Sequence, residues 1–90
     1  MPSDYENIRS QSQRSIVAFI QTDLELVDAF IVTAQLAKAE GDTERYEWSK
    51  TKAIKVIATV RQFLNQVDSV DMQAKLDRRL AQLDEDSSKL

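Results

Sequence analysis

The sequence predicts an all-α protein, folded as an antiparallel three-helix bundle with an up-down-up arrangement. Its 90 residues include one glycine and one proline, fewer than the turns of a β-sheet require. Apolar residues recur every three to four positions along three stretches of the chain, which is the helical period. A hydrophobic content of 42% with 30% charged residues is typical of one globular domain.

The first helix is predicted over residues 15–40. Phe19 and Leu26 widen its apolar stripe on one side, as expected of a helix wedged between two others. A carboxylate, Asp23, interrupts the stripe. The stripe consists of Ile16, Val17, Phe19, Ile20, Leu24, Val27, Phe30, Ile31, Ala34 and Ala37.

A corner follows at Gly41, a residue type that readily adopts the left-handed conformation closing a helix. Asp42 or Thr43 offers a side-chain oxygen to the free amides of the next helix. The second helix is therefore predicted over residues 43–66. Its stripe consists of Tyr46, Ala53, Val56, Ile57, Val60, Phe63, Leu64 and Val67.

Asp68 and Ser69 form a second break, with Ser69 as the candidate cap of a third helix over residues 70–84. This helix has a narrower stripe and is expected to cover the groove between the first two, so that the bundle spans residues 15–84. Residues 85–90 are expected to fray, although Leu90 is in phase with Leu83. The stripe consists of Met72, Leu76, Leu80 and Leu83.

Residues 1–14 contain few apolar anchors. Ser3 and Glu6 resemble a capping box. Two alternatives are open for this segment, a flexible extension or a partly helical continuation of the first helix.

The composition excludes several chemistries. The chain has no histidine and no cysteine, which removes imidazole ligands, thiol nucleophiles and the usual general base. A net charge of −3 argues against nucleic-acid binding, and no apolar run approaches the length of a membrane span. We expect a cytoplasmic protein that is not an enzyme and uses no cofactor and no metal.

Asp23 has two interpretations, because a carboxylate in a core column is costly unless it is paired or reaches water. In the first interpretation, Asp23 is a buried acid with a raised pKa. In the second, which we favour, its carboxylate reaches solvent at the edge of the stripe or pairs with a base such as Arg61 or Lys50. Asp23, Glu25 and Asp28 lie within two turns, but carboxylate metal sites in bundles also use histidine.

The chain's only tryptophan, Trp48, lies near Arg45, Lys52 and Lys55 on the second helix. One interpretation is a partner surface, which would bind an acidic peptide through charge and cation–π contacts. The favoured interpretation is that Trp48 packs against Leu36 or Ala39 of the first helix.

The charges are segregated along the chain. Residues 15–42 carry one lysine and five acids, residues 43–67 five basic residues and two acids, and residues 68–86 three basic residues and six acids. The alternating net charges of the three segments favour an antiparallel arrangement of neighbouring helices.

Ala29, Val32 and Leu36 form a second apolar strip on the back of the first helix. The three-helix core does not require it, and exposed apolar strips mark self-association or partner binding. Isolated exposed valines and leucines are also ordinary, so both interpretations stand.

The stretch AKAEGDTERYEWSKTKAIKV, residues 37–56, resembles the corner of tetratricopeptide-like hairpins and of microtubule-interacting-and-trafficking domains, the latter being three-helix modules that bind peptides. A single such unit does not form a repeat protein. The stretch also resembles the Gly-Asp corner of lactose-type IIA phosphocarrier proteins, whose phosphorylated histidine has no counterpart here. In overall layout the chain is similar to small uncharacterised bacterial three-helix proteins.

These observations predict a non-catalytic helical interaction or structural module, with a homodimer through Ala29, Val32 and Leu36 as one form. The alternative is a peptide-recognition domain that uses Arg45, Trp48, Lys52 and Lys55. A remote alternative is a small enzyme built on Asp or Glu with Lys or Arg, for which no cluster of arginines is apparent.

Overall fold

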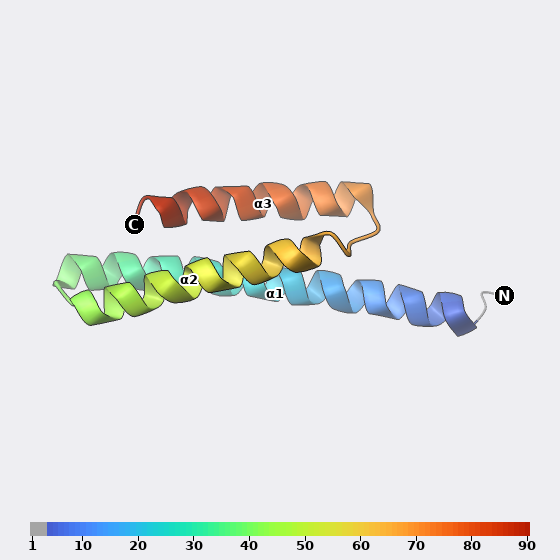
Figure 1. Cartoon of the computed structure of the whole chain (residues 1–90), viewed down its shortest axis with the longest axis horizontal. Coiled ribbons are helices and arrows are strands. Elements are labelled where there is room, and N and C mark those ends of the chain that lie inside the picture. The colour runs from blue at the N-terminus through green and yellow to red at the C-terminus, as the bar shows by residue number, and fades with distance from the viewer. Residues whose placement is uncertain (1–3) are drawn as a thin grey trace.

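The computed structural model describes the backbone of residues 4–90 and the side chains of residues 11–90. It contains three helices, α1 (Asp4–Glu40), α2 (Thr43–Leu64) and α3 (Val70–Ser88), and no strand within residues 4–90 (Figure 1). The prediction of an all-α chain with three helices is confirmed.

The corner between α1 and α2 is built as the sequence predicts. Gly41 has a φ of +75°, and the Asp42 amide donates to the Ala37 carbonyl at 2.8 Å, which closes α1 with a left-handed residue. The Asp42 carboxylate then accepts from the Arg45 amide at 3.1 Å and caps α2. The corner therefore ends α1 and begins α2.

The second connection begins two residues earlier than predicted, because α2 ends at Leu64. Ser69 caps α3 as expected, since its hydroxyl accepts from the Met72 amide at 3.3 Å. The side chain of Gln13 in α1 holds this connection by two hydrogen bonds. Its Nε2 donates to the Gln66 carbonyl at 2.8 Å and its Oε1 accepts from the Asp68 amide at 2.9 Å.

Helix α1 begins at Asp4, so residues 4–14 adopt the helical alternative considered for this segment. Residues 1–3 of the predicted extension lie outside the described residues. Because Gln13 contacts the connection between α2 and α3, the C-terminal part of this segment has a structural role.

Helix α3 continues to Ser88, four residues beyond the predicted end. The expected frayed tail over residues 85–90 is not what the structure has, because the side chain of Ser87 is 3% exposed and Leu90 packs against the core. The Leu90 carbonyl also accepts from the Tyr46 hydroxyl and, at 3.4 Å, from Lys38 Nζ. The end of α3 therefore contacts both helices of the first corner.

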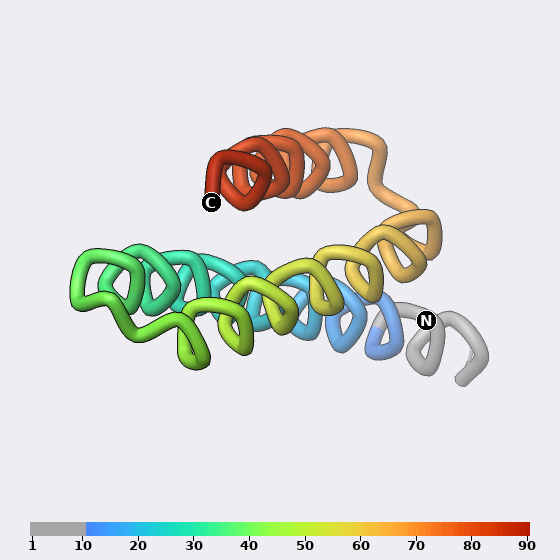
Figure 2. Tube along the Cα trace, turned by 60° about the vertical axis from the view of Figure 1, so that its left-hand side comes forward, coloured from blue at the N-terminus to red at the C-terminus, as the bar shows by residue number. Residues whose placement is uncertain are grey.

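The core lies where α3 covers one face of the α1–α2 pair. In two views, α1 and α2 lie side by side and α3 lies along one side of them (Figures 1 and 2). The buried side chains of this cluster are aliphatic throughout. They are Ile20, Leu24, Val27, Ile31, Ala53, Ile57, Val60, Leu64, Val67, Leu76, Leu80 and Leu83.

Candidate interaction surface

The three phenylalanines and the tryptophan of the chain all lie outside this core. Phe19 of α1 meets Phe63 of α2 edge to face, with ring centroids 5.0 Å apart, and Phe30 meets Trp48 in the same way at 5.6 Å. Leu26 shares their face of α1, since it follows Phe19 by seven residues and precedes Phe30 by four. We call these five residues, Phe19, Leu26, Phe30, Trp48 and Phe63, the aromatic seam.

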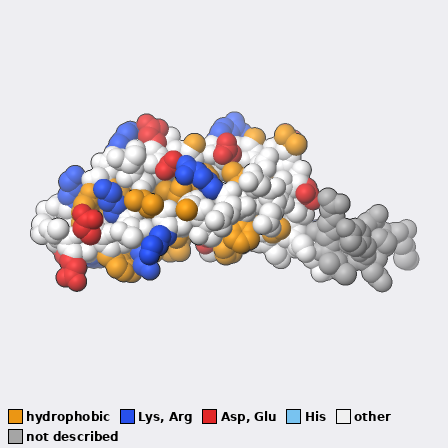
Figure 3. Space-filling model, in the orientation of Figure 1, with side chains coloured by type: hydrophobic (Ala, Val, Ile, Leu, Met, Phe, Trp, Pro, Cys, Tyr) orange, Lys and Arg blue, Asp and Glu red, His pale blue; other side chains and the backbone are white. Residues whose placement is uncertain are grey.

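The aromatic seam is open to solvent. Phe19 is 44%, Leu26 42% and Trp48 54% exposed, while Phe30 and Phe63 are half-buried and pack against the core from outside. Apolar side chains gather at several places along the edge of the molecule away from α3 (Figure 3). The widening of the first stripe predicted at Phe19 and Leu26 is therefore real, but α3 does not cover it.

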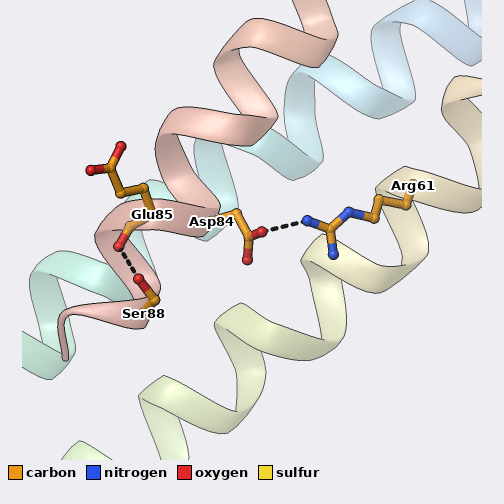
Figure 4. A network of polar contacts seen from close by, with 4 residues as sticks. All are labelled: Arg61, Asp84, Glu85 and Ser88. Carbon is orange, nitrogen blue, oxygen red and sulfur yellow. Dashed lines mark hydrogen bonds and ion pairs between the residues drawn. The ribbon is translucent and has the colours of Figure 1, made fainter.

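Two ion pairs show which side α3 occupies. Asp28 of α1 pairs with Arg79 of α3 at 3.7 Å, and Leu26 lies two positions from Asp28, about 200° around the helix. Arg61 of α2 pairs with Asp84 of α3 (Figure 4), and Phe63 lies two positions from Arg61. On both helices the aromatic seam thus faces away from α3.

Asp23 borders the aromatic seam, one turn after Phe19, and is half-buried. Burial raises the pKa of its carboxyl above the usual 3.8. Its suggested partners are engaged elsewhere, because Arg61 pairs with Asp84 and Lys50 Nζ lies 5.7 Å from the centroid of the Tyr46 ring. The favoured interpretation has two forms, and the described ion pairs do not include one between Asp23 and Arg61 or Lys50. The carboxylate instead lies at the edge of the stripe, partly exposed to solvent, as the other form expects.

The predicted partner surface on α2 is exposed in large part. Arg45, Trp48 and Lys55 are exposed and Lys52 is half-buried, with Lys52 Nζ 5.7 Å from the centroid of the Trp48 ring. Trp48 meets Phe30 of α1 edge to face, a contact that the sequence did not indicate. Leu36 and Ala39, the expected packing partners, are both exposed. The basic residues therefore extend along α2 from the Trp48 end of the aromatic seam to its middle.

The predicted self-association strip also lies on the surface. Val32 is 47% and Leu36 54% exposed, and Ala29 is exposed as well. Ala29 is three residues from Leu26, so the strip borders the aromatic seam and continues around α1 away from α2. The sequence analysis separated the strip from Phe19 and Leu26, because it assigned those two residues to the core.

An open groove of about 440 Å³ lies between α1 and the connection from α2 to α3. Val17, Val67 and Met72 line it, with Arg14 and Asp68 at its polar side. The groove has room for a small apolar group. Within the described residues, no group of three or more acidic side chains is arranged to hold a metal ion.

Comparisons with protein-family models, with curated proteins and with solved structures gave no match. Of the helices that the structure describes, none combines the length and the apolar character needed to cross a membrane.

Proposed function

We propose that this protein is a small, non-catalytic helical interaction module, an antiparallel up-down-up bundle that binds a protein partner through the aromatic seam. One observation carries the proposal: the chain places its phenylalanines and its tryptophan on one open face, while the core is aliphatic. We propose a cytoplasmic location from the sequence alone.

Aromatic side chains dominate the energetics of interfaces, because each buries a large apolar area and pairs favourably edge to face. Tryptophan in particular is enriched among the residues that contribute most to binding. Trp48 is the most exposed member of the aromatic seam at 54%, so it has the most area left to bury against a partner. Charged residues at the margin, such as Lys55, fit the polar rim that surrounds such a centre.

A crosslinking experiment tests this function without assuming the partner's identity. A photoreactive phenylalanine analogue is placed at Leu26, or as a control at Arg78, an exposed residue of α3, in cells that make the chain. We expect covalent adducts at Leu26 and none at Arg78. Equal labelling at the two positions, or no adduct at Leu26, would contradict the proposal.

The contact between Lys52 and Trp48 favours a second candidate, recognition of an acidic peptide by Arg45, Trp48, Lys52 and Lys55. A cation over an indole ring presents both charge and an apolar face to such a ligand. The double variant Lys52→Glu, Lys55→Glu would then lose its crosslinks to another protein. Retained crosslinks in this folded variant would leave the apolar seam as the binding surface.

A further inference from the structure

The charges of α1 and α2 make the aromatic seam self-complementary, so that it can pair with an identical surface. Residues 15–42 carry one lysine and five acids, and residues 43–67 carry five basic residues and two acids. Of these residues, Asp28 and Arg61 pair with α3 on the opposite groove. The charged residues at the aromatic seam are Asp23 on α1 and Arg45, Lys52 and Lys55 on α2, so the two helices of this face carry opposite charges. A surface with both signs in two parallel bands can pair with an identical surface.

From this we infer that the aromatic seam binds a second copy of the chain, with the two-fold axis parallel to the helices, so that acidic α1 of each copy lies against basic α2 of the other. The inference rests on the proposed function and names its partner. A two-fold axis at right angles to the helices would instead place α1 on α1 and α2 on α2. That arrangement brings like charges together, which costs free energy across an interface.

The ring contacts fix the register of this dimer. Phe30 is level with Trp48, and Phe19 with Phe63, so Lys55 is level with the turn of α1 that carries Asp23 and Glu25. An axis parallel to the helices preserves these heights. Asp23 is the acid of that turn that lies on the aromatic seam, because it follows Phe19 by four residues. Lys55 of each copy then comes level with Asp23 of the other, for which the described side chains include no ion-pair partner.

The size of the face matches a dimer interface. The 22 residues of α2 span about 33 Å, and two adjacent helices are about 20 Å wide, which gives a flat face of about 650 Å². A stable interface buries about 800 Å² on each partner, about an eighth of the 6238 Å² surface of the chain. Side-chain relief adds to the flat area, so the aromatic seam with its charged margins is large enough.

Paired substitutions on α1 locate the interface. Leu26→Glu puts a carboxylate into the aromatic seam, and Val32→Glu puts one at a site of similar exposure, 47% against 42%, on the far side of the same helix. We expect the wild type to have twice the mass of 10.3 kDa by light scattering, Leu26→Glu to be a monomer and Val32→Glu to remain a dimer. Circular dichroism checks that both variants are folded.

The orientation has its own test in a charge exchange between Asp23 and Lys55. Lys55→Glu replaces attraction by repulsion at two symmetric sites, and we expect dimerisation to weaken about tenfold. The double variant Asp23→Lys, Lys55→Glu restores the pairing and is expected to recover most of that loss. A double variant no better than the single one would overturn the proposed two-fold axis.

Four further outcomes overturn the proposed dimer. A wild-type chain that remains monomeric at concentrations up to about 100 µM has no dimer of useful affinity. A monomeric Val32→Glu with a dimeric Leu26→Glu would transfer the interface to the strip of Ala29, Val32 and Leu36. Crosslinks from Leu26 to a different protein, with a monomeric wild type, would refute the dimer and leave the proposed function intact, whereas no adduct of any mass would refute both.

Discussion

Ser49 offers a sharp test of how α1 and α2 pack. Its side chain is fully buried in α2, and its hydroxyl has no hydrogen-bond partner among the described residues. The neighbouring buried positions near this corner, Ala34, Ala37 and Ala53, are small and apolar. A buried hydroxyl in such surroundings pays for desolvation without a compensating bond.

We expect Ser49→Ala to stabilise the protein by about 1–2 kcal/mol. The unpaired buried hydroxyl costs about 1–3 kcal/mol, and alanine adds a few tenths of a kcal/mol of helix propensity, against a small loss of packing where the oxygen was. For a domain of this size, 1 kcal/mol corresponds to roughly 4–8 °C in Tm. Urea unfolding followed by circular dichroism measures the change.

Thr51→Ala is the matched control, since Thr51 lies on the same helix two residues later and is exposed. It reports helix propensity alone. If Ser49→Ala gains no more than Thr51→Ala, the hydroxyl is satisfied in solution and the argument fails. Ser49→Val tests how tightly α1 and α2 pack around residue 49. Overpacking at a buried site costs about 1–3 kcal/mol, so we expect this variant to be less stable than the wild type.

Two more predictions concern Asp23 and Gln13. Because burial raises the folded-state pKa of Asp23, the contribution of this carboxyl to stability is fully present below about pH 3.8 and is lost as pH rises through the folded pKa. The stability gain of Asp23→Asn over the wild type, measured by urea unfolding, should therefore grow with pH. A gain independent of pH would contradict the burial. Gln13→Ala removes both hydrogen bonds to the α2–α3 connection. It should lower the free energy of unfolding by about 1 kcal/mol and speed hydrogen exchange at the Asp68 amide. The control Gln11→Ala, at an exposed site two residues earlier, should do neither, and equal effects of the two variants would refute the role of Gln13.

The boundaries that depend on local chemistry were predictable. Gly41, Asp42 and Ser69 act through their own backbone conformation or through amides two or three residues away, so their roles follow from the sequence. The end of α3 depends instead on distant groups, because Tyr46 and Lys38 bind the Leu90 carbonyl. No pattern near residue 84 carries that information.

The candidate surface was predictable only in part. The sequence identified Trp48 with its basic neighbours, and separately the exposed strip at Val32 and Leu36. It did not show that Phe19 and Leu26 are exposed. The width of an apolar stripe shows how much of a helix surface is apolar, but not which part of that surface another helix of the same chain covers. That choice depends on where α3 docks.

The geometry of a helix pair explains why one face stays open. Two helices side by side form two grooves, one on each face, and α3 has a single narrow stripe with which to fill one of them. Its buried residues Leu76, Leu80 and Leu83 follow one line, so α3 cannot reach the opposite groove.

The ion pairs Asp28–Arg79 and Arg61–Asp84 lie on the groove that α3 fills, so the charges of α3 match the side it occupies. The opposite groove retains the aromatic seam. Phe30 and Phe63 contribute to the core from outside, but Phe19, Leu26 and Trp48 leave about half of their surface in water, which a stable three-helix core alone does not require. Their place on the open groove is therefore the strongest reason to expect that another helix pair covers it.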